Sequence, residues 1–190
     1  MATTTAPASS APASLVTWKL DPAHSSAEFK VKHMMISNVK GTFTGLSGVL
    51  VSQDHTDLTK SSVEASIPVA SLNTGDPQRD GHLKSADFLD ADKFPTMTFK
   101  SNQVERGHDE GFRVTGDLTL HGITQLFTFT VEGVSEPAKD PWGNTRIGLS
   151  ATAKINRKDF GLTWNSPLET GGVLVGEDVH ITLDVQFIKG

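Results

Sequence analysis

Four charged or titratable side chains lie close together in one short segment of this sequence, namely Arg79, Asp80, His82 and Lys84. Asp80 and His82 are of the types that act as general acids or bases, and an arginine such as Arg79 can hold an anionic group through two parallel hydrogen bonds. The same mixture of charges is also typical of an exposed helix surface that contacts only water. The residues alone leave both interpretations open.

A few other polar residues are candidates for contact with a ligand. Arg157 belongs to a second polar run, shortly before Phe160. His33 has the same alternation parity as Phe29 and Val31, so we expect it to point inward, where it would either bond to a backbone carbonyl or touch a ligand. With His24 included, the candidates for contact with an anionic head group are His24, Arg79, Asp80, His82 and Arg157.

The familiar catalytic and metal-binding patterns do not occur in the sequence. The segment 75–85 resembles a phosphate loop only superficially, because five residues separate its two glycines and two residues separate Gly81 from Lys84. The segment 45–48 falls within strand-like sequence rather than at the strand-to-helix turn of a serine hydrolase. There is no cysteine, and no two histidines are spaced i, i+2 or i, i+4. We therefore predict no metal site and no catalytic residues in a recognisable order.

The charge balance and hydropathy exclude further classes of function. Lysine and arginine together number 17 and aspartate and glutamate number 22, so the formal net charge is −5. This argues against a broad basic surface, and neither nucleic acid nor an anionic membrane is an expected partner. No run approaches the ~18 consecutive apolar residues of a membrane-spanning helix, so no integral membrane segment is predicted.

The length of 190 residues corresponds to one domain, which we place at residues 15–190 after a tail at residues 1–14. After Met1 the tail contains only alanine, threonine, serine and proline, which bury too little apolar surface to fold, so we predict that it is disordered. It also lacks the basic start and the apolar run of a secretory signal. We therefore expect the chain to remain in the cytoplasm.

The dominant pattern after the tail is alternation of apolar and polar residues with period two, which is typical of strands with one dry and one wet face. The segments that show it are 16–20, 27–33, 39–50, 63–69, 96–100, 112–120, 127–131, 147–155 and 179–187. A one-residue slip near Thr44 and Gly45 predicts a β-bulge inside the third segment. One-sided alternation favours an antiparallel sheet, and a dry face of this length must close on itself or stack. We predict an all-β fold, an eight-stranded antiparallel barrel.

The interior of such a barrel is either packed solid or hollow enough for one small ligand. Small residues are frequent on the inferred inner face, which favours a hollow, although they are also used where strands curve or approach closely. These small residues are Ala27, Gly41, Gly48, Ala65, Ser101, Gly116, Ala151 and Ala153. The residues expected to line the pore are Phe29, Val31, His33, Phe43, Ile67, Leu83, Phe88, Phe99, Leu118, Phe127, Phe129, Leu149, Ala151, Ile155 and Ile181.

One helical segment is predicted, at residues 76–90. Pro77 suits the first position of a helix, Thr74 or Asp76 can cap it, and Leu83, Phe88 and Leu89 supply an apolar side. The segment interrupts the strands, so it could close the mouth of a pore or simply cap the core.

Several short motifs, in their order and spacing from residue 18 to residue 189, resemble the YceI-like family, the polyisoprenoid-binding, lipocalin-like barrels of bacteria. They include Trp18, Leu20 and Asp21 with His24 and Ser25, the SLNTG of 71–75, Arg79, Asp80 and His82, the ADFLD of 86–90, Gly116 with Leu118, Gly122 with Thr124, and Arg157 with Phe160 and Gly161.

The resemblance implies a lipocalin-like barrel whose elongated apolar pore binds, carries or stores an isoprenoid, an isoprenoid quinone or a fatty-acid-like amphiphile, often as a homodimer. It implies no cofactor other than such a bound lipid. Many relatives reach the periplasm through a signal, in whose place this sequence has residues 2–14. Two alternatives remain: an enzyme acting on a lipophilic substrate through His24, Asp80 or His82 at the barrel mouth, and a stress-related structural or interaction protein whose pore is incidental.

Overall fold

The alternating segments form the strands of a barrel. The computed structural model describes residues 15–53, 57–108, 111–169 and 171–190, and the predicted tail at residues 1–14 lies outside them. Its strands in chain order are β1 (Val16–Leu20), β2 (Ser26–His33), β3 (Ser37–Phe43), β4 (Ser47–Ser52), β5 (Ser62–Pro68), β6 (Thr96–Arg106), β7 (Phe112–Leu120), β8 (Ile123–Glu132), β9 (Ala138–Lys139), β10 (Thr145–Asn156) and β11 (Val175–Lys189). The helices are α1 (Pro77–Lys84) and the 3₁₀ turns η1 (Pro22–His24), η2 (Leu58–Lys60), η3 (Val69–Ser71) and η4 (Arg157–Phe160).

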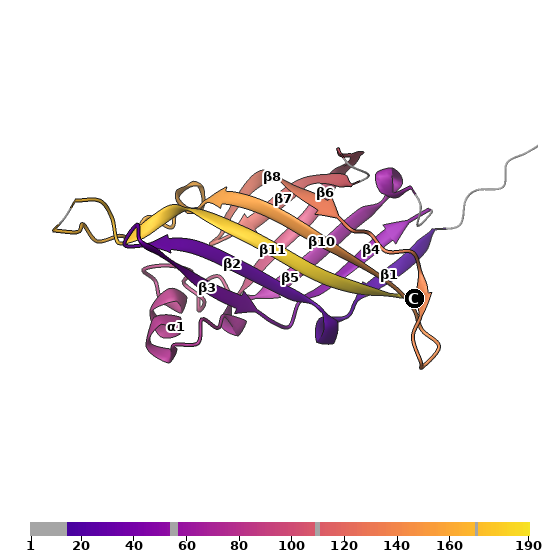
Figure 1. Ribbon diagram of the computed structural model, residues 1–190, viewed down its shortest axis with the longest axis horizontal. Coiled ribbons are helices and arrows are strands. Elements are labelled where there is room, and N and C mark those ends of the chain that lie inside the picture. The colour runs from indigo at the N-terminus through magenta and orange to yellow at the C-terminus, as the bar shows by residue number, and fades with distance from the viewer. Residues whose placement is uncertain (1–14, 54–56, 109–110, 170) are drawn as a thin grey trace, which may run out of the picture.

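These strands make a closed, eight-stranded antiparallel barrel with one short helix (Figure 1), which confirms the predicted fold class. β1 and β2 share one position because both pair with β11, near its C-terminal end and along its first half respectively. β4 and β3 share the next position, because β4 pairs with β1 and β3 pairs with β2. The short β9 pairs only with the first two residues of β10, and the pairing of β10 with β11 closes the barrel.

The prediction of a bulge near Thr44 is wrong. Residues 39–50 form two strands, β3 and β4, separated by residues 44–46 and by Gly45 with a φ of +67°. β1 and β2 are themselves separated by the turn η1. The chain must break at residues 44–46 because β3 pairs with β2 while β4 pairs with β1.

The predicted helix is correct at its start and too long at its end. Asp76 caps α1, since its side chain accepts hydrogen bonds from the backbone N–H groups of Gln78 and Arg79. The helix ends at Lys84 rather than at residue 90, and Asp90 has a φ of +47°, which a continuing helix does not allow. None of the helices in the described part of the chain is long and apolar enough to cross a membrane.

The small inner residues serve two purposes. Gly41 lies against the Phe29 ring, and at Gly48 and Gly116 a side chain would collide with the backbone of the neighbouring strand. These three glycines therefore allow close approach rather than create space. Ala27, Ala65 and Ala151, in contrast, line an internal cavity.

Candidate functional site

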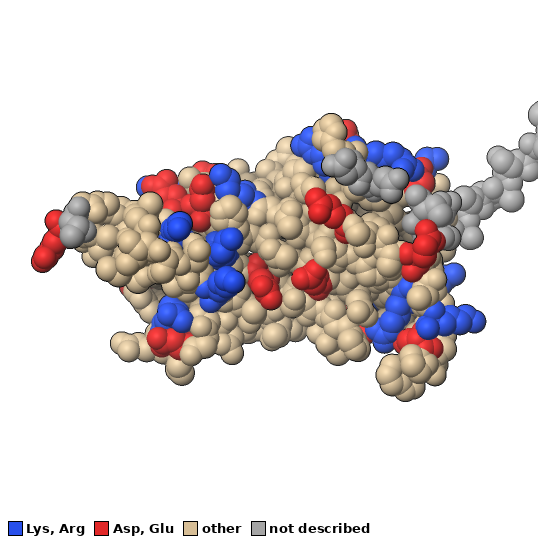
Figure 2. All heavy atoms as spheres, in the orientation of Figure 1, with Lys and Arg blue, Asp and Glu red and all other residues tan. Residues whose placement is uncertain are grey.

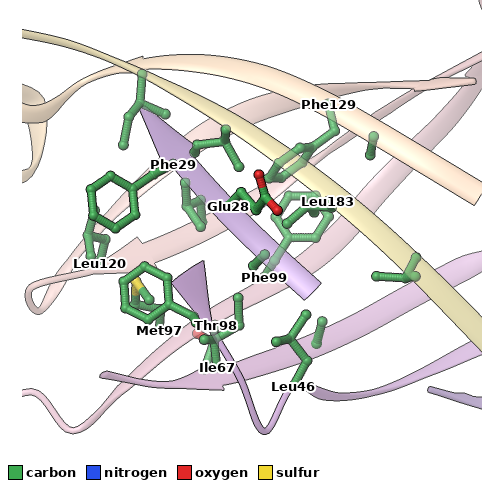
Figure 3. A pocket seen from close by; sticks show the side chains of 18 of the residues that line it. Glu28, Phe29, Leu46, Ile67, Met97, Thr98, Phe99, Leu120, Phe129 and Leu183 are labelled. Atoms are coloured by element: carbon green, nitrogen blue, oxygen red, sulfur yellow. The ribbon is translucent and has the colours of Figure 1, made fainter. Parts of the chain in front are cut away.

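An apolar cavity of about 290 Å³ runs along the inside of the barrel. Figure 3 shows aromatic and aliphatic side chains around it, among them Phe29, Met97 and Phe129. Its volume is near the lower end of the range for small-molecule pockets. Only a few polar residues contribute to its wall: Glu28, Ser61, Ser66, Thr98 and Arg157. The wall therefore offers burial to apolar groups and few hydrogen-bond partners to polar ones.

Most residues expected to line the pore belong to the cavity wall. They are Phe29, Val31, Phe43, Ile67, Leu83, Phe88, Phe99, Leu118, Phe129, Leu149, Ala151, Ile155 and Ile181. His33 and Phe127 are not part of it. His33 is the last residue of β2, beside the hairpin turn, and Phe127 packs edge-on against the Phe129 ring with the centroids 5.1 Å apart.

The cavity extends further toward the β6–β7 turn than the alternation indicated. Val104 and Leu58 line this part and are both buried. An irregularity between Ser101 and Gln103 shifts the parity of β6, so Val104 faces inward although its number is even. Leu58 belongs to the 3₁₀ turn η2, where apolar and polar residues do not alternate as they do in a strand. Only a prediction of this β-bulge in β6 would have assigned Val104 to the inner face.

Arg79 and Asp80 both bind Thr74 instead of facing the cavity. The Arg79 guanidinium donates from Nε to Thr74 Oγ1 (2.7 Å) and from Nη2 to the Thr74 carbonyl (2.9 Å). Asp80 accepts hydrogen bonds from the backbone N–H (2.9 Å) and the hydroxyl (2.5 Å) of Thr74. The Thr74 hydroxyl is the main cause that lowers the pKa of Asp80. The two side chains thus fasten the segment before α1.

His82 takes part in a cluster of three rings. Its centroid lies 5.1 Å from that of Phe88 and 4.8 Å from that of Trp164, both in edge-to-face geometry, and the Phe88 and Trp164 centroids are 5.0 Å apart. Its Nε2 lies 2.9 Å from an oxygen of Asp87. We call His82, Phe88 and Trp164 the aromatic latch, because they join the α1 segment to the loop at residues 161–174. Phe88 also lines the cavity, so the latch covers one end of it.

Arg157 is buried in the wall at this same end. It donates from Nε to the Gly176 carbonyl (2.8 Å), from Nη2 to the Val175 carbonyl (3.3 Å) and from Nη1 to the Leu162 carbonyl. Burial lowers the pKa of its guanidinium. Its donors are directed at backbone carbonyls, so the residue holds the loop at residues 161–174 to the start of β11.

His24 belongs to a different network, which centres on Arg146. The guanidinium of Arg146 donates from Nη1 to Asp21 Oδ2 (2.5 Å) and from Nε to Asp140 Oδ2 (2.7 Å), and His24 Nδ1 lies 2.8 Å from Asp21 Oδ2. The bond from Arg146, followed by that from His24, lowers the pKa of Asp21 to about 2. Partial burial acts to raise the pKa of Asp140, but hydrogen bonds from Arg146 and Asn144 outweigh it, so that pKa is also lowered.

The three candidate acid–base residues are consequently not brought together. His24 is bonded to Asp21, Asp80 to Thr74 and His82 to Asp87. Among the residues that the structure describes, no three histidine or carboxylate side chains are grouped so as to hold a metal ion. The geometry supports binding of an apolar molecule, and within the described ranges these three candidates are not arranged as a nucleophile beside a base.

The sequence of the chain is similar to known proteins over most of its length. The model of the YceI-like domain matches residues 18–187. A UPF0312 protein of Staphylococcus aureus (strain N315) is 41% identical over 175 residues, which cover 91% of this chain and 98% of that relative.

Solved structures share the barrel. The YceI protein of Campylobacter jejuni is 33% identical, with a TM-score of 0.68 over 84% of this chain and 90% of that one. BcnA of Burkholderia cenocepacia is 23% identical, with a TM-score of 0.75 over 88% of this chain and 98% of that one. A polyisoprenoid binding domain from Saccharophagus degradans is 17% identical, with a TM-score of 0.64 over 91% of this chain and 98% of that one. At these last two identities the likeness concerns the fold alone.

Proposed function

The chain belongs to the YceI-like family, and from the geometry of its cavity we propose that it binds, and so carries or stores, a long-chain lipid such as an isoprenoid, an isoprenoid quinone or a fatty-acid-like chain. The observation that carries the proposal is the apolar wall, which continues along the barrel while Arg79, Asp80 and His82 bond to other partners outside it.

The shape of the cavity favours a chain over a compact ligand. Its wall follows β7 from Phe112 to Leu120. At about 3.3 Å per residue this is about 26 Å of strand, or about 20 Å along a barrel axis from which strands tilt by roughly 40°. A narrow volume of about 290 Å³ spread over this length suits an extended chain. The neighbour from Saccharophagus degradans, described as polyisoprenoid-binding, has the same fold and is consistent with such a ligand.

Affinity then depends on chain length more than on the head group. Each buried CH₂ contributes about 0.8 kcal/mol without any directed polar contact. The proposed role is binding without chemical turnover, because the side chains suited to acid–base chemistry are engaged elsewhere.

Solvent extraction of the purified protein followed by mass spectrometry tests the proposal. We expect a co-purified long-chain lipid, and we expect the emptied protein to bind farnesol and a dansyl-labelled fatty acid. A protein that yields no lipid and binds neither probe would contradict the proposal.

A pair of variants on β10 shows whether the ligand occupies the cavity. Ala151 lines the cavity, whereas its neighbour Thr152 is exposed on the outer face. Ala151→Trp should abolish binding of both probes with little loss of stability, because the ring enters the hollow. In a solid core the same change would cost about 1 to 3 kcal/mol or more. Thr152→Trp is the matched control and should bind both probes normally.

A further inference from the structure

The turn between β2 and β3 exposes apolar side chains to solvent. Ile36 is 80% exposed and Met35 is 56% exposed, and Met34 and Val173 beside them are also exposed. The loop at residues 161–174 meets the turn, since the Met34 N–H donates to the Leu174 carbonyl at 2.7 Å. We call Met34, Met35, Ile36 and Val173 the apolar tip. It lies at the end of the barrel that carries α1 (Figure 1).

The backbone of the apolar tip is unfavourable for the residues that it contains. Ile36 N–H donates to the His33 carbonyl at 3.2 Å, and the two central residues have positive φ, 51° at Met34 and 63° at Met35. Turns with two positive φ values favour Asn-Gly, because a side chain on an L-residue crowds the backbone there. Folding therefore gains nothing from two methionines at these positions. Strain of this kind at an exposed site points to a role in recognition.

Unpaired lysines lie on the outer face of the same strands. Lys30 on β2 is directly opposite Lys40 on β3 and is flanked on β11 by His180. Like charges in register destabilise a sheet. Neither Lys30, Lys40 nor the nearby Lys32 has an ion-pair partner among the described residues. Figure 2 shows several basic side chains on this half of the molecule, with acidic side chains between them.

Two of the four acidic groups near the lysines are engaged in ion pairs. Asp178 pairs with Lys154 at 3.1 Å, and Glu177 pairs with Lys158 at 2.5 Å. Glu28 on β2, which also borders the cavity, and Glu169, on the loop that follows η4, are exposed carboxylates without a partner in the described residues. The basic surface is therefore local, and the net charge of −5, an average over all faces, does not reveal it.

We propose that the apolar tip, together with Lys30, Lys32 and Lys40, docks this end of the barrel onto an anionic lipid surface. Methionine and isoleucine side chains at the tip enter the boundary between head groups and acyl chains, and the lysines behind them meet anionic head groups. Lys30 lies four residues from Met34, which is about 13 Å of strand, so both can reach the same interface.

A lipid surface fits these residues better than a second copy of the chain. A stable protein interface uses about 20 to 30 residues from each partner, and the tip is a narrow turn of a few residues. Two copies meeting through this face would also bring their unpaired lysines together. Anionic head groups, in contrast, neutralise the lysines and accept the apolar side chains.

Co-sedimentation with vesicles tests the proposal. The probes are vesicles of phosphatidylcholine alone and vesicles of phosphatidylcholine and phosphatidylglycerol in a three-to-one ratio. We expect binding to the mixed vesicles that weakens with added salt, and much weaker binding to phosphatidylcholine alone. Absence of binding to the mixed vesicles would overturn the proposal, whether or not the protein holds a lipid in its cavity.

A turn variant separates binding from folding. The double substitution Met34→Asn and Met35→Gly supplies the residues that this turn favours, so the melting temperature should stay the same or rise. Vesicle binding should nevertheless fall by at least about tenfold, because two apolar side chains no longer insert. Leu126→Ser removes an apolar side chain that is 69% exposed on β8 and should leave binding unchanged.

Charge variants test the contribution of the lysines to vesicle binding. Lys30→Gln and Lys40→Gln should each weaken binding to the mixed vesicles about fivefold. Lys19→Gln, an exposed lysine of β1, should have no effect, and Glu169→Gln should strengthen binding. Equal binding by native protein and turn variant would overturn the proposal. So would a native dimer that the turn variant dissociates, because the tip would then be a contact between copies.

Discussion

At the end of the barrel that carries the β9–β10 hairpin, Arg146 joins Asp21 and Asp140, whereas at the end that carries α1 the rings of His82, Phe88 and Trp164 meet. Hydrogen bonds to charged groups contribute about 1.5 to 3 kcal/mol each. Aromatic pairs contribute about 0.5 to 1.5 kcal/mol beyond their burial, and rings can slide apart without leaving an unpaired charge. We therefore expect the Arg146 end to stay closed and the latch end to open when the proposed ligand enters.

Removing Arg146 should give the largest effect on stability. Its side chain is 18% exposed, and those of Asp21 and Asp140 are 10% and 7% exposed. Arg146→Ala removes the guanidinium that both carboxylates share and leaves Asp21 with His24 and Asp140 with Asn144, so we expect the largest loss of stability among these variants. Chemical denaturation measures the loss, and Arg106→Ala, which removes an exposed arginine, serves as the control. Similar losses for the two variants would mean that the network does not hold this end.

Acid should weaken the Arg146 end of the barrel. The pKa of Asp21 is lowered from 3.8 to about 2, so the folded protein keeps this carboxylate ionised where the unfolded chain binds a proton. The stabilisation is present above about pH 4 and is lost as the pH falls toward 2. Denaturation midpoints measured across this range should decline, and in Asp21→Asn the decline should be smaller. An unchanged slope in Asp21→Asn would show that other carboxylates control the acid response.

Opening of the latch should control ligand exchange more than stability. Trp164→Leu removes two ring contacts, and a loss of about 1.4 kcal/mol corresponds to a tenfold change in rate. We expect the dansyl-labelled fatty acid to dissociate about tenfold faster in stopped-flow displacement. Trp142→Leu changes a tryptophan that is 79% exposed at the opposite end and should leave the rate unchanged. If Arg146→Ala released the ligand faster and Trp164→Leu did not, the opening would lie at the Arg146 end.

The smallest effect is expected at Arg79. Its guanidinium bonds to Thr74, is partly exposed and does not line the cavity. Arg79→Ala should lower stability by about 1 kcal/mol or less. In titrations, Arg79→Ala should bind a fatty acid with the affinity of the native protein. It should likewise bind the alcohol of equal chain length with the native affinity. A selective loss for the acid would instead place the anionic head group at Arg79.

The aromatic latch and the break between β3 and β4 could not be predicted from residues that are neighbours in the sequence. Trp164 lies in a loop without periodic pattern, and its contact with His82 joins positions far apart in the chain. The break at residues 44–46 depends on β3 pairing with β2 while β4 pairs with a different strand, β1. Arg79 and Asp80 belonged to the family motif, but their common partner, Thr74, follows from how the segment before α1 turns.

The sequence by itself determined the barrel and most of the residues that face its interior. Alternation with period two is a local property of an extended chain, so Phe29, Leu118 and Ile181 could be assigned to the inner face without knowing their neighbours. The tertiary structure alone decided how each end is closed. Asp21 and Arg146 are 125 residues apart and meet only once the strands are in register, because an ion pair depends on distance in space and not on spacing in the chain.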